Sequence, residues 1–159
     1  MYIAVSALSS TDELWVELDD YRYHLQDVNS WHLQDRLIEE QQPAINPPIL
    51  MRKSASCRAR KRADFLWGGG VGVHVVSQVF IDALVEFGAT GWETYPIDLV
   101  NGLGQEIPGY IGFLEEIGGA GDVKSSDDGM RGAFSVDVTG DLYEFLRARK
   151  LRFKKHHSS

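Results

Sequence analysis

The segment from Ser77 to Gly88 constrains the fold most, because it carries every signal of one short helix. Its apolar residues recur at the spacing of a single helix face: Phe80, Ala83, Leu84 and Phe87. Ser77 is a preferred N-cap, since its hydroxyl can accept a hydrogen bond from an amide of the first turn. Gly88 stands where the left-handed residue that ends a helix is needed. We therefore predict an amphipathic helix over Gln78–Phe87.

Four glycines lie between Trp67 and Val73, and they raise the question of a phosphate-binding loop. A Walker-type loop requires a lysine and a hydroxyl residue directly after its last glycine, whereas Gly72 is followed by Val73 and His74. The dinucleotide-binding fingerprint requires a third glycine, and Val73 occupies that position. We interpret the glycines as a hinge that lets the backbone turn beside Trp67, and we expect no cofactor.

Much of the remaining chain has the pattern of short strands. Tyr2–Leu8 is short and rich in apolar residues, which is typical of a strand. Trp92–Leu99 and Tyr110–Ile117 predict a hairpin with a long loop. Pro96 places the first of these strands at a sheet edge or at a bulge, because proline cannot donate to a central ladder. A second short helix is predicted near the C-terminus, where Asp141 and Glu144 form a variant of the capping box.

These patterns together predict an α+β fold. We expect a single domain over residues 1–159, made mainly of antiparallel sheet with two or three short amphipathic helices. Residues 41–62 are predicted to form an internal loop, because three prolines block regular helix and the run that follows is basic and polar. Residues 154–159 read as a disordered tail.

The charged residues are unevenly distributed. The formal net charge is −7, yet 12 of the 16 Lys and Arg residues lie in residues 52–62 and 147–155, which contain no acid. The rest of the chain therefore carries a formal charge of −19. An acidic body of this kind suits a basic protein partner and argues against general nucleic-acid binding. A solvated surface with uneven local composition would give the same pattern.

The expected location of the protein and the expected state of its cysteine follow from features that the sequence lacks. No run of 18 apolar residues is present, so we expect no membrane span. The N-terminus lacks the basic and apolar regions of a secretory signal, so we expect a cytoplasmic protein. The single cysteine, Cys57, excludes an internal disulfide and a four-cysteine zinc site, and we expect it to be a surface thiol.

The sequence contains no catalytic constellation that outweighs a structural role. Ser77 is not in a nucleophile motif, and its capping role already explains it. The motif HLQD occurs twice, which puts His24 and His32 eight residues apart, but no third metal ligand accompanies them. Glu115 and Glu116 are adjacent on a predicted strand, so they point to opposite faces and cannot act as a paired acid and base. We expect no catalytic and no metal-binding residue.

Several segments resemble an immunity-protein family of bacterial polymorphic toxin systems. The resemblance extends from Asp64 to Phe153. In chain order the matching segments are Asp64 with an aromatic segment, Val75-Val76-Ser77, Phe80–Leu84, Gly88–Ile97, Gly109–Leu114 and Val138–Phe153. A sister group carries a double C-x-x-C-G motif, from which this chain departs with its lone Cys57. The resemblance implies a protein that binds and neutralises a toxin encoded beside it, and no zinc site.

An acidic contact surface for a basic toxin is the expectation that follows from this resemblance and from the charge. The candidate partner-binding residues are Glu115, Glu116, Asp122, Asp127 and Asp128. Trp67 and Tyr110 are candidate aromatic anchors, although packing in the core explains both residues better.

Two other functions fit the same sequence. The chain can be a small enzyme or ligand-binding domain whose site brings together His74, Tyr95 and Asp98. It can also be a phage or assembly component that uses its basic stretches to contact nucleic acid or a neighbouring subunit.

Overall fold

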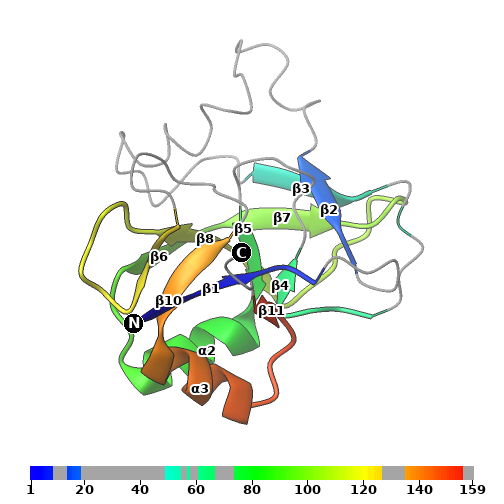
Figure 1. Ribbon diagram of the computed structural model, residues 1–159. Coiled ribbons are helices and arrows are strands. Elements are labelled where there is room, and N and C mark those ends of the chain that lie inside the picture. Colours follow the sequence, from blue (N-terminus) through cyan, green and yellow to red (C-terminus); the bar gives the residue numbers. More distant parts are fainter. Residues whose placement is uncertain are drawn as a thin grey trace.

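The computed structural model describes residues 1–8, 14–18, 49–54, 57, 61–66, 74–126 and 135–155. Within them, short strands and two helices form the predicted α+β fold, which is mainly antiparallel sheet (Figure 1). In chain order the elements are β1 (Tyr2–Ser6), β2 (Val16–Leu18), β3 (Ile49–Lys53), β4 (Phe65–Leu66), β5 (His74–Ser77), α2 (Gln78–Phe87), β6 (Trp92–Tyr95), β7 (Ile97–Val100), β8 (Tyr110–Glu115), β9 (Val123–Ser125), β10 (Val136–Thr139), α3 (Gly140–Ala148) and β11 (Lys154–Lys155).

The described strands form three small sheets. Their orders are β11-β1-β10-β9, β4-β5-β8-β6 and β2-β3-β7. The strand pairs are antiparallel except for β3 and β7, which run parallel. In Figure 1 the two helices lie side by side at one end of the molecule, and the sheet of β2, β3 and β7 lies at the other end.

The sheet β4-β5-β8-β6 separates two apolar clusters. Val76 and Phe113 on one of its faces pack with both helices and with the sheet that contains β1. Val75 and Leu114 on the opposite face pack with residues of β3 and β7. Because side chains alternate along a strand, neighbouring residues of β5 and of β8 belong to different cores. This sheet is buried on both faces.

Helix α2 confirms the predicted bounds and both predicted caps. The Ser77 hydroxyl accepts a hydrogen bond from the Phe80 amide at 3.0 Å. Gly88 adopts a left-handed conformation with φ of 79°, and its amide donates to the carbonyls of Leu84 and Val85. The buried residues Phe80, Ile81, Ala83 and Leu84 include three of the four on the predicted apolar face.

Helix α3 starts earlier than predicted. Thr139 is the N-cap and its side chain makes no capping hydrogen bond, so Asp141 lies in the first turn and the predicted capping box is wrong. A carboxylate in the first turn still stabilises the helix through the helix dipole. Leu142 and Leu146 are buried, as their spacing predicts.

Pro96 divides the predicted strand Trp92–Leu99 between two sheets. Before it, β6 pairs antiparallel with β8 at the edge of one sheet, which confirms the predicted hairpin. After it, β7 pairs with β3 in another sheet. Proline has no amide hydrogen to continue the ladder, which explains why the chain changes sheets here.

Three sequence-based expectations are corrected by the fold. Residues 41–62 are not wholly a loop, because Ile49–Lys53 form β3, the middle strand of its sheet. Residues 154–159 are not wholly a disordered tail, because Lys154 and Lys155 pair with β1; residues 156–159 lie outside the described part. Cys57 is buried at 5% exposure within an apolar cluster and is therefore not a surface thiol. In each case packing against a distant segment overrides the local composition.

Asp64 joins three segments that are far apart in the sequence. Its Oδ1 accepts a hydrogen bond from the Ser77 hydroxyl at 2.6 Å, and its Oδ2 accepts one from the Arg152 amide at 2.6 Å. Its backbone donates to the Arg152 carbonyl and accepts from the Ser77 amide. One carboxylate thus fixes the start of α2 and the segment that leads into β11.

Candidate functional site

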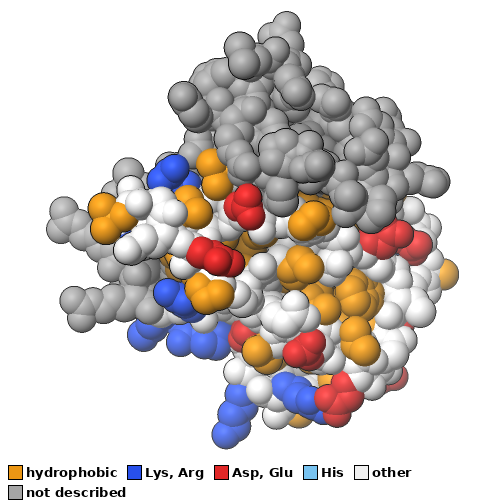
Figure 2. All heavy atoms as spheres, turned by 180° about the vertical axis from the view of Figure 1, so that it is seen from behind, with side chains coloured by type: hydrophobic (Ala, Val, Ile, Leu, Met, Phe, Trp, Pro, Cys, Tyr) orange, Lys and Arg blue, Asp and Glu red, His pale blue; other side chains and the backbone are white. Residues whose placement is uncertain are grey.

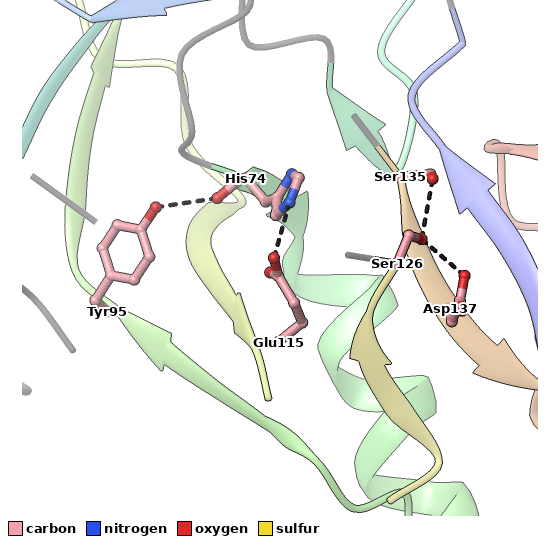
Figure 3. Close-up of polar contacts among 6 residues, drawn as sticks. All are labelled: His74, Tyr95, Glu115, Ser126, Ser135 and Asp137. Atoms are coloured by element: carbon pink, nitrogen blue, oxygen red, sulfur yellow. Dashed lines mark hydrogen bonds and ion pairs between the residues drawn. The ribbon is translucent and has the colours of Figure 1, made fainter. Parts of the chain in front are cut away.

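His74 and Glu115 form a buried polar pair on the central sheet. His74 of β5 lies opposite Phe113 of β8 in the strand register, and Glu115 is two residues further along β8. The two side chains are therefore diagonal neighbours on one face. The distance from His74 Nε2 to Glu115 Oε1 is 3.5 Å, and the side chains are 8% and 0% exposed (Figure 3).

One aromatic side chain contacts the imidazole, and another contacts the His74 backbone from the other face of the sheet. The Phe65 ring meets the imidazole edge-on, with ring centroids 5.3 Å apart. On the opposite face, the Tyr95 hydroxyl donates to the His74 carbonyl oxygen at 3.2 Å. Burial raises the pKa of Tyr95 well above its ordinary value, and the negative charge of Glu115 raises it further. Tyr95 therefore stays a neutral hydrogen-bond donor.

Gly112 allows this arrangement of Tyr95. A β-carbon at position 112 would lie 2.2 Å from the Tyr95 ring, which is far inside van der Waals contact. The ring packs directly over the backbone of β8 for this reason. A close approach of this kind is one of the few reasons for glycine inside a strand.

The alternative site of His74, Tyr95 and Asp98 is only partly assembled. His74 and Tyr95 touch, but through the His74 carbonyl oxygen rather than through the imidazole. Asp98 is exposed on β7, which belongs to another sheet. Among the described residues, no group of three His, Cys, Asp or Glu side chains is arranged to hold a metal ion. The His74–Glu115 pair is a buried polar contact of the core.

The structure corrects the prediction that Glu115 contributes to an acidic contact surface. Glu115 is 1% exposed, so it cannot contact a protein partner without unfolding of the strand. Glu116, its neighbour, is exposed, as the alternation of side chains along β8 requires. Glu115 shares the face of Phe113, and this apolar neighbour was the available signal that the glutamate would be buried.

Asp122 is half-buried and has a structural role. Its Oδ2 accepts hydrogen bonds from the amide and the hydroxyl of Thr90, at 3.0 and 3.3 Å. Its Oδ1 accepts from the Thr139 hydroxyl at 3.3 Å, and its backbone carbonyl accepts from the Thr139 amide. Asp122 therefore ties the loop after α2 to the end of β10. The other candidates, Asp127 and Asp128, lie outside the described residues.

Of the two candidate aromatic anchors, only Tyr110 falls in the described part of the chain. Its hydroxyl donates to the Ala63 carbonyl oxygen at 2.9 Å. Burial raises the pKa of Tyr110 to about 12, against the lowering effect of the nearby Arg62. Tyr110 thus serves the packing of the sheet. Trp67, His24 and His32 lie outside the described residues.

A second polar cluster in Figure 3 lies where β9 ends and β10 begins. The Ser126 hydroxyl donates to Asp137 Oδ1 at 2.7 Å and accepts from the Ser135 hydroxyl at 3.0 Å. These contacts are exposed to solvent. They hold the two strand ends together, and they involve no histidine that could activate a serine.

The charge pattern along the chain adds a feature that the sequence-based candidates do not capture. Residues 63–123 contain nine Asp and Glu and no Lys or Arg. Six of the nine acids are exposed: Asp82, Glu86, Glu93, Asp98, Glu106 and Glu116. Glu86 forms a salt bridge with Arg149, whose hydrogen bond lowers the pKa of Glu86. We call the other five the acidic set.

The exposed Lys and Arg residues gather elsewhere. All six basic residues of the segment 147–155 are exposed. Figure 2 shows one face on which Asp, Glu and apolar side chains are spread together, while most of the Lys and Arg side chains lie along one side of the view.

Comparison with known proteins gives no family for this chain. No protein-family model matches it, and no curated protein matches it. The resemblance to an immunity-protein family therefore stays a prediction. Neither of the described helices combines the length and the apolar character needed to cross a membrane.

Proposed function

We propose that this chain is an immunity protein that binds a cognate bacterial toxin of basic charge and inhibits it. The observation that carries the proposal is the stretch of 61 residues, 63–123, with nine acids and no Lys or Arg, six of whose acids are exposed. The resemblance of the segments within Asp64–Phe153 to an immunity-protein family supports the same function.

The physical basis of the proposal is electrostatic. A surface of one sign attracts a partner of the opposite sign before contact, which raises the association rate and disfavours wrong partners. Arg149 of one basic stretch pairs with Glu86, and the other exposed acids of residues 63–123 form the acidic set. Such an inhibitor needs no catalytic group, because it acts by covering a surface of the toxin.

The test of this function is a growth assay with the protein encoded beside this chain. Expression of that neighbour alone is expected to stop bacterial growth, and co-expression of this chain is expected to restore it. A neighbour that is harmless when expressed alone, or that kills equally in the presence of this chain, would overturn the proposal.

Charge reversal on the acidic set is expected to weaken neutralisation. The variant Glu93→Lys/Glu116→Lys changes two exposed residues within 63–123, which should reduce the attraction of a basic toxin. We expect at least about a tenfold fall in association rate at low salt, measured by surface plasmon resonance.

A matched control uses two exposed acids of α3. The variant Asp141→Lys/Glu144→Lys changes the net charge by the same amount but lies outside residues 63–123. Its association rate should fall much less. Equal losses in both variants would indicate that only the net charge matters, and that no acidic contact surface exists in this stretch.

A further inference from the structure

The fold brings together two basic parts of the chain that are far apart in the sequence. The Asp64 amide donates to the Arg152 carbonyl at 2.9 Å, and the Arg152 amide donates to Asp64 Oδ2 at 2.6 Å. Residues 61–62 come just before Asp64 in the chain, so they lie near the segment 147–155 that contains Arg152. We define the basic surface as the exposed Lys and Arg residues of these two segments: Lys61, Arg62, Arg147, Arg149, Lys150, Arg152, Lys154 and Lys155.

The acids Glu86 and Asp64 contact this surface without neutralising it. Glu86 pairs with Arg149, and the two carboxylate oxygens of Asp64 accept hydrogen bonds from the Ser77 hydroxyl and the Arg152 amide. The segment 147–155 itself contains no acid. These two acids therefore balance only a small part of the charge of eight basic residues. Like charges that the fold places close together repel one another, and a bound anion would relieve this repulsion.

The helix dipole accounts for only part of this arrangement. Arg147 lies in the last turn of α3 and Arg149 is its C-cap, where a cation stabilises the negative end of the helix. Lys154 and Lys155 lie beyond the helix on β11, and residues 61–62 precede β4. The dipole does not explain these four cations, whereas an anionic ligand would account for the whole set.

The basic surface lacks the apolar centre of a protein interface. The large apolar side chains exposed in the described part of the chain are Met1, Val79, Val85, Leu103 and Ile117, and none of them belongs to residues 61–62 or 147–155. Protein partners bury apolar and aromatic anchors at the centre of their interface, where charged residues are depleted. Interfaces with nucleic acids are instead polar and positively charged, because Lys and Arg contact phosphates. The composition therefore favours a nucleic-acid backbone over an acidic protein.

The net charge of −7 does not prevent such a local contact. At physiological ionic strength, exposed charges more than about 8 Å apart are largely screened from each other. Phosphates on the basic surface are therefore attracted mainly by the cations beside them. The same screening makes the binding weak and dependent on salt. The charge pattern argues against general nucleic-acid binding, and the contact expected here is confined to one surface.

We propose that the basic surface binds the phosphate backbone of a nucleic acid without reading its sequence. Contacts from Lys and Arg to phosphates release counterions and need no element that reaches the bases. This inference goes beyond the proposed function, because the basic surface contains no residue of the acidic set.

Fluorescence anisotropy with a labelled DNA duplex of about 20 base pairs and arbitrary sequence tests this proposal at low salt. Three proteins are compared. They are the unchanged chain, Arg147→Gln/Lys154→Gln, and the control Lys53→Gln/Lys124→Gln, which removes two positive charges outside the basic surface. We expect the unchanged chain to bind with Kd of about 10 μM or tighter, the first variant to bind at least about tenfold more weakly, and the control to change less than about twofold. Equal melting temperatures would show that all three fold.

The salt dependence distinguishes phosphate contacts from an indirect effect on structure. The logarithm of the binding constant falls linearly with the logarithm of the salt concentration, with a slope set by the number of phosphates contacted. Loss of two such contacts in Arg147→Gln/Lys154→Gln should reduce the steepness of this slope by about 1.8, and the control should leave it unchanged.

Three results would overturn the proposal. The first is no binding of the duplex by the unchanged chain at about 100 μM protein and low salt. The second is equal weakening in both variants, since the net charge alone would then control binding. The third is displacement of the duplex by a polyglutamate peptide of equal total charge, which would indicate an acidic protein as the partner. None of these results bears on toxin neutralisation, which the growth assay tests separately.

Discussion

The His74→Leu substitution is expected to lower the free energy of unfolding by about 1–3 kcal/mol, because it removes one partner of a buried polar pair. The Glu115 side chain is fully buried, and the imidazole lies 3.5 Å from its carboxyl group. The substitution removes a favourable interaction of a buried polar group, which costs free energy. Chemical denaturation measures the loss directly.

A double variant separates the polar pair from ordinary packing. In His74→Leu/Glu115→Met both polar groups are replaced by apolar side chains of similar volume. Since neither polar group of the pair remains in the core, the double variant should recover at least about half of the stability that the single variant loses. A single variant that loses less than about 1 kcal/mol would contradict the assignment of a buried structural pair.

Replacing Asp64 by alanine is expected to lower the free energy of unfolding by about 2–4 kcal/mol. The substitution removes two hydrogen bonds to a carboxylate, from the Ser77 hydroxyl and from the Arg152 amide, each worth about 1.5–3 kcal/mol when shielded from water. Asp64 is half-buried, so solvent recovers part of this cost. For a domain of this size, about 1 kcal/mol corresponds to a shift of roughly 2–4 °C in melting temperature.

Asp82→Ala is the matched control for this effect. Asp82 is exposed on α2 and accepts one hydrogen bond, from Gln78 at 3.0 Å. Its replacement should change the free energy of unfolding by less than about 0.5 kcal/mol. If Asp64→Ala were as mild as Asp82→Ala, Asp64 would not be the link between β4, α2 and the C-terminal segment.

The sequence was most informative where the signals are local. The bounds of α2 follow from one capping serine, one terminal glycine and four apolar residues in between, all within twelve positions. Pro96 likewise indicates a sheet edge or an interrupted strand, because proline has no amide hydrogen to donate to a neighbouring strand. For the same reason the pairing of β6 with β8 could be predicted.

What the sequence did not reveal depends on contacts between distant segments. The basic composition after Pro48 suggested a loop, yet Ile49–Lys53 pair with strands on both sides. Phe113 indicates that Glu115 is the buried one of the two adjacent glutamates, because both residues lie on the same face of β8. The contact of Glu115 with His74 depends on the register of β8 against β5, which no local pattern specifies.

The central claim is that this chain neutralises a basic toxin by binding it, and one titration tests it most directly. The purified chain is titrated into the purified product of the neighbouring gene by calorimetry, at low and at physiological salt. We expect a one-to-one complex with Kd on the order of nanomolar, which weakens as salt rises because opposite charges are screened. No binding at about micromolar concentration, or an affinity that does not change with salt, would contradict it.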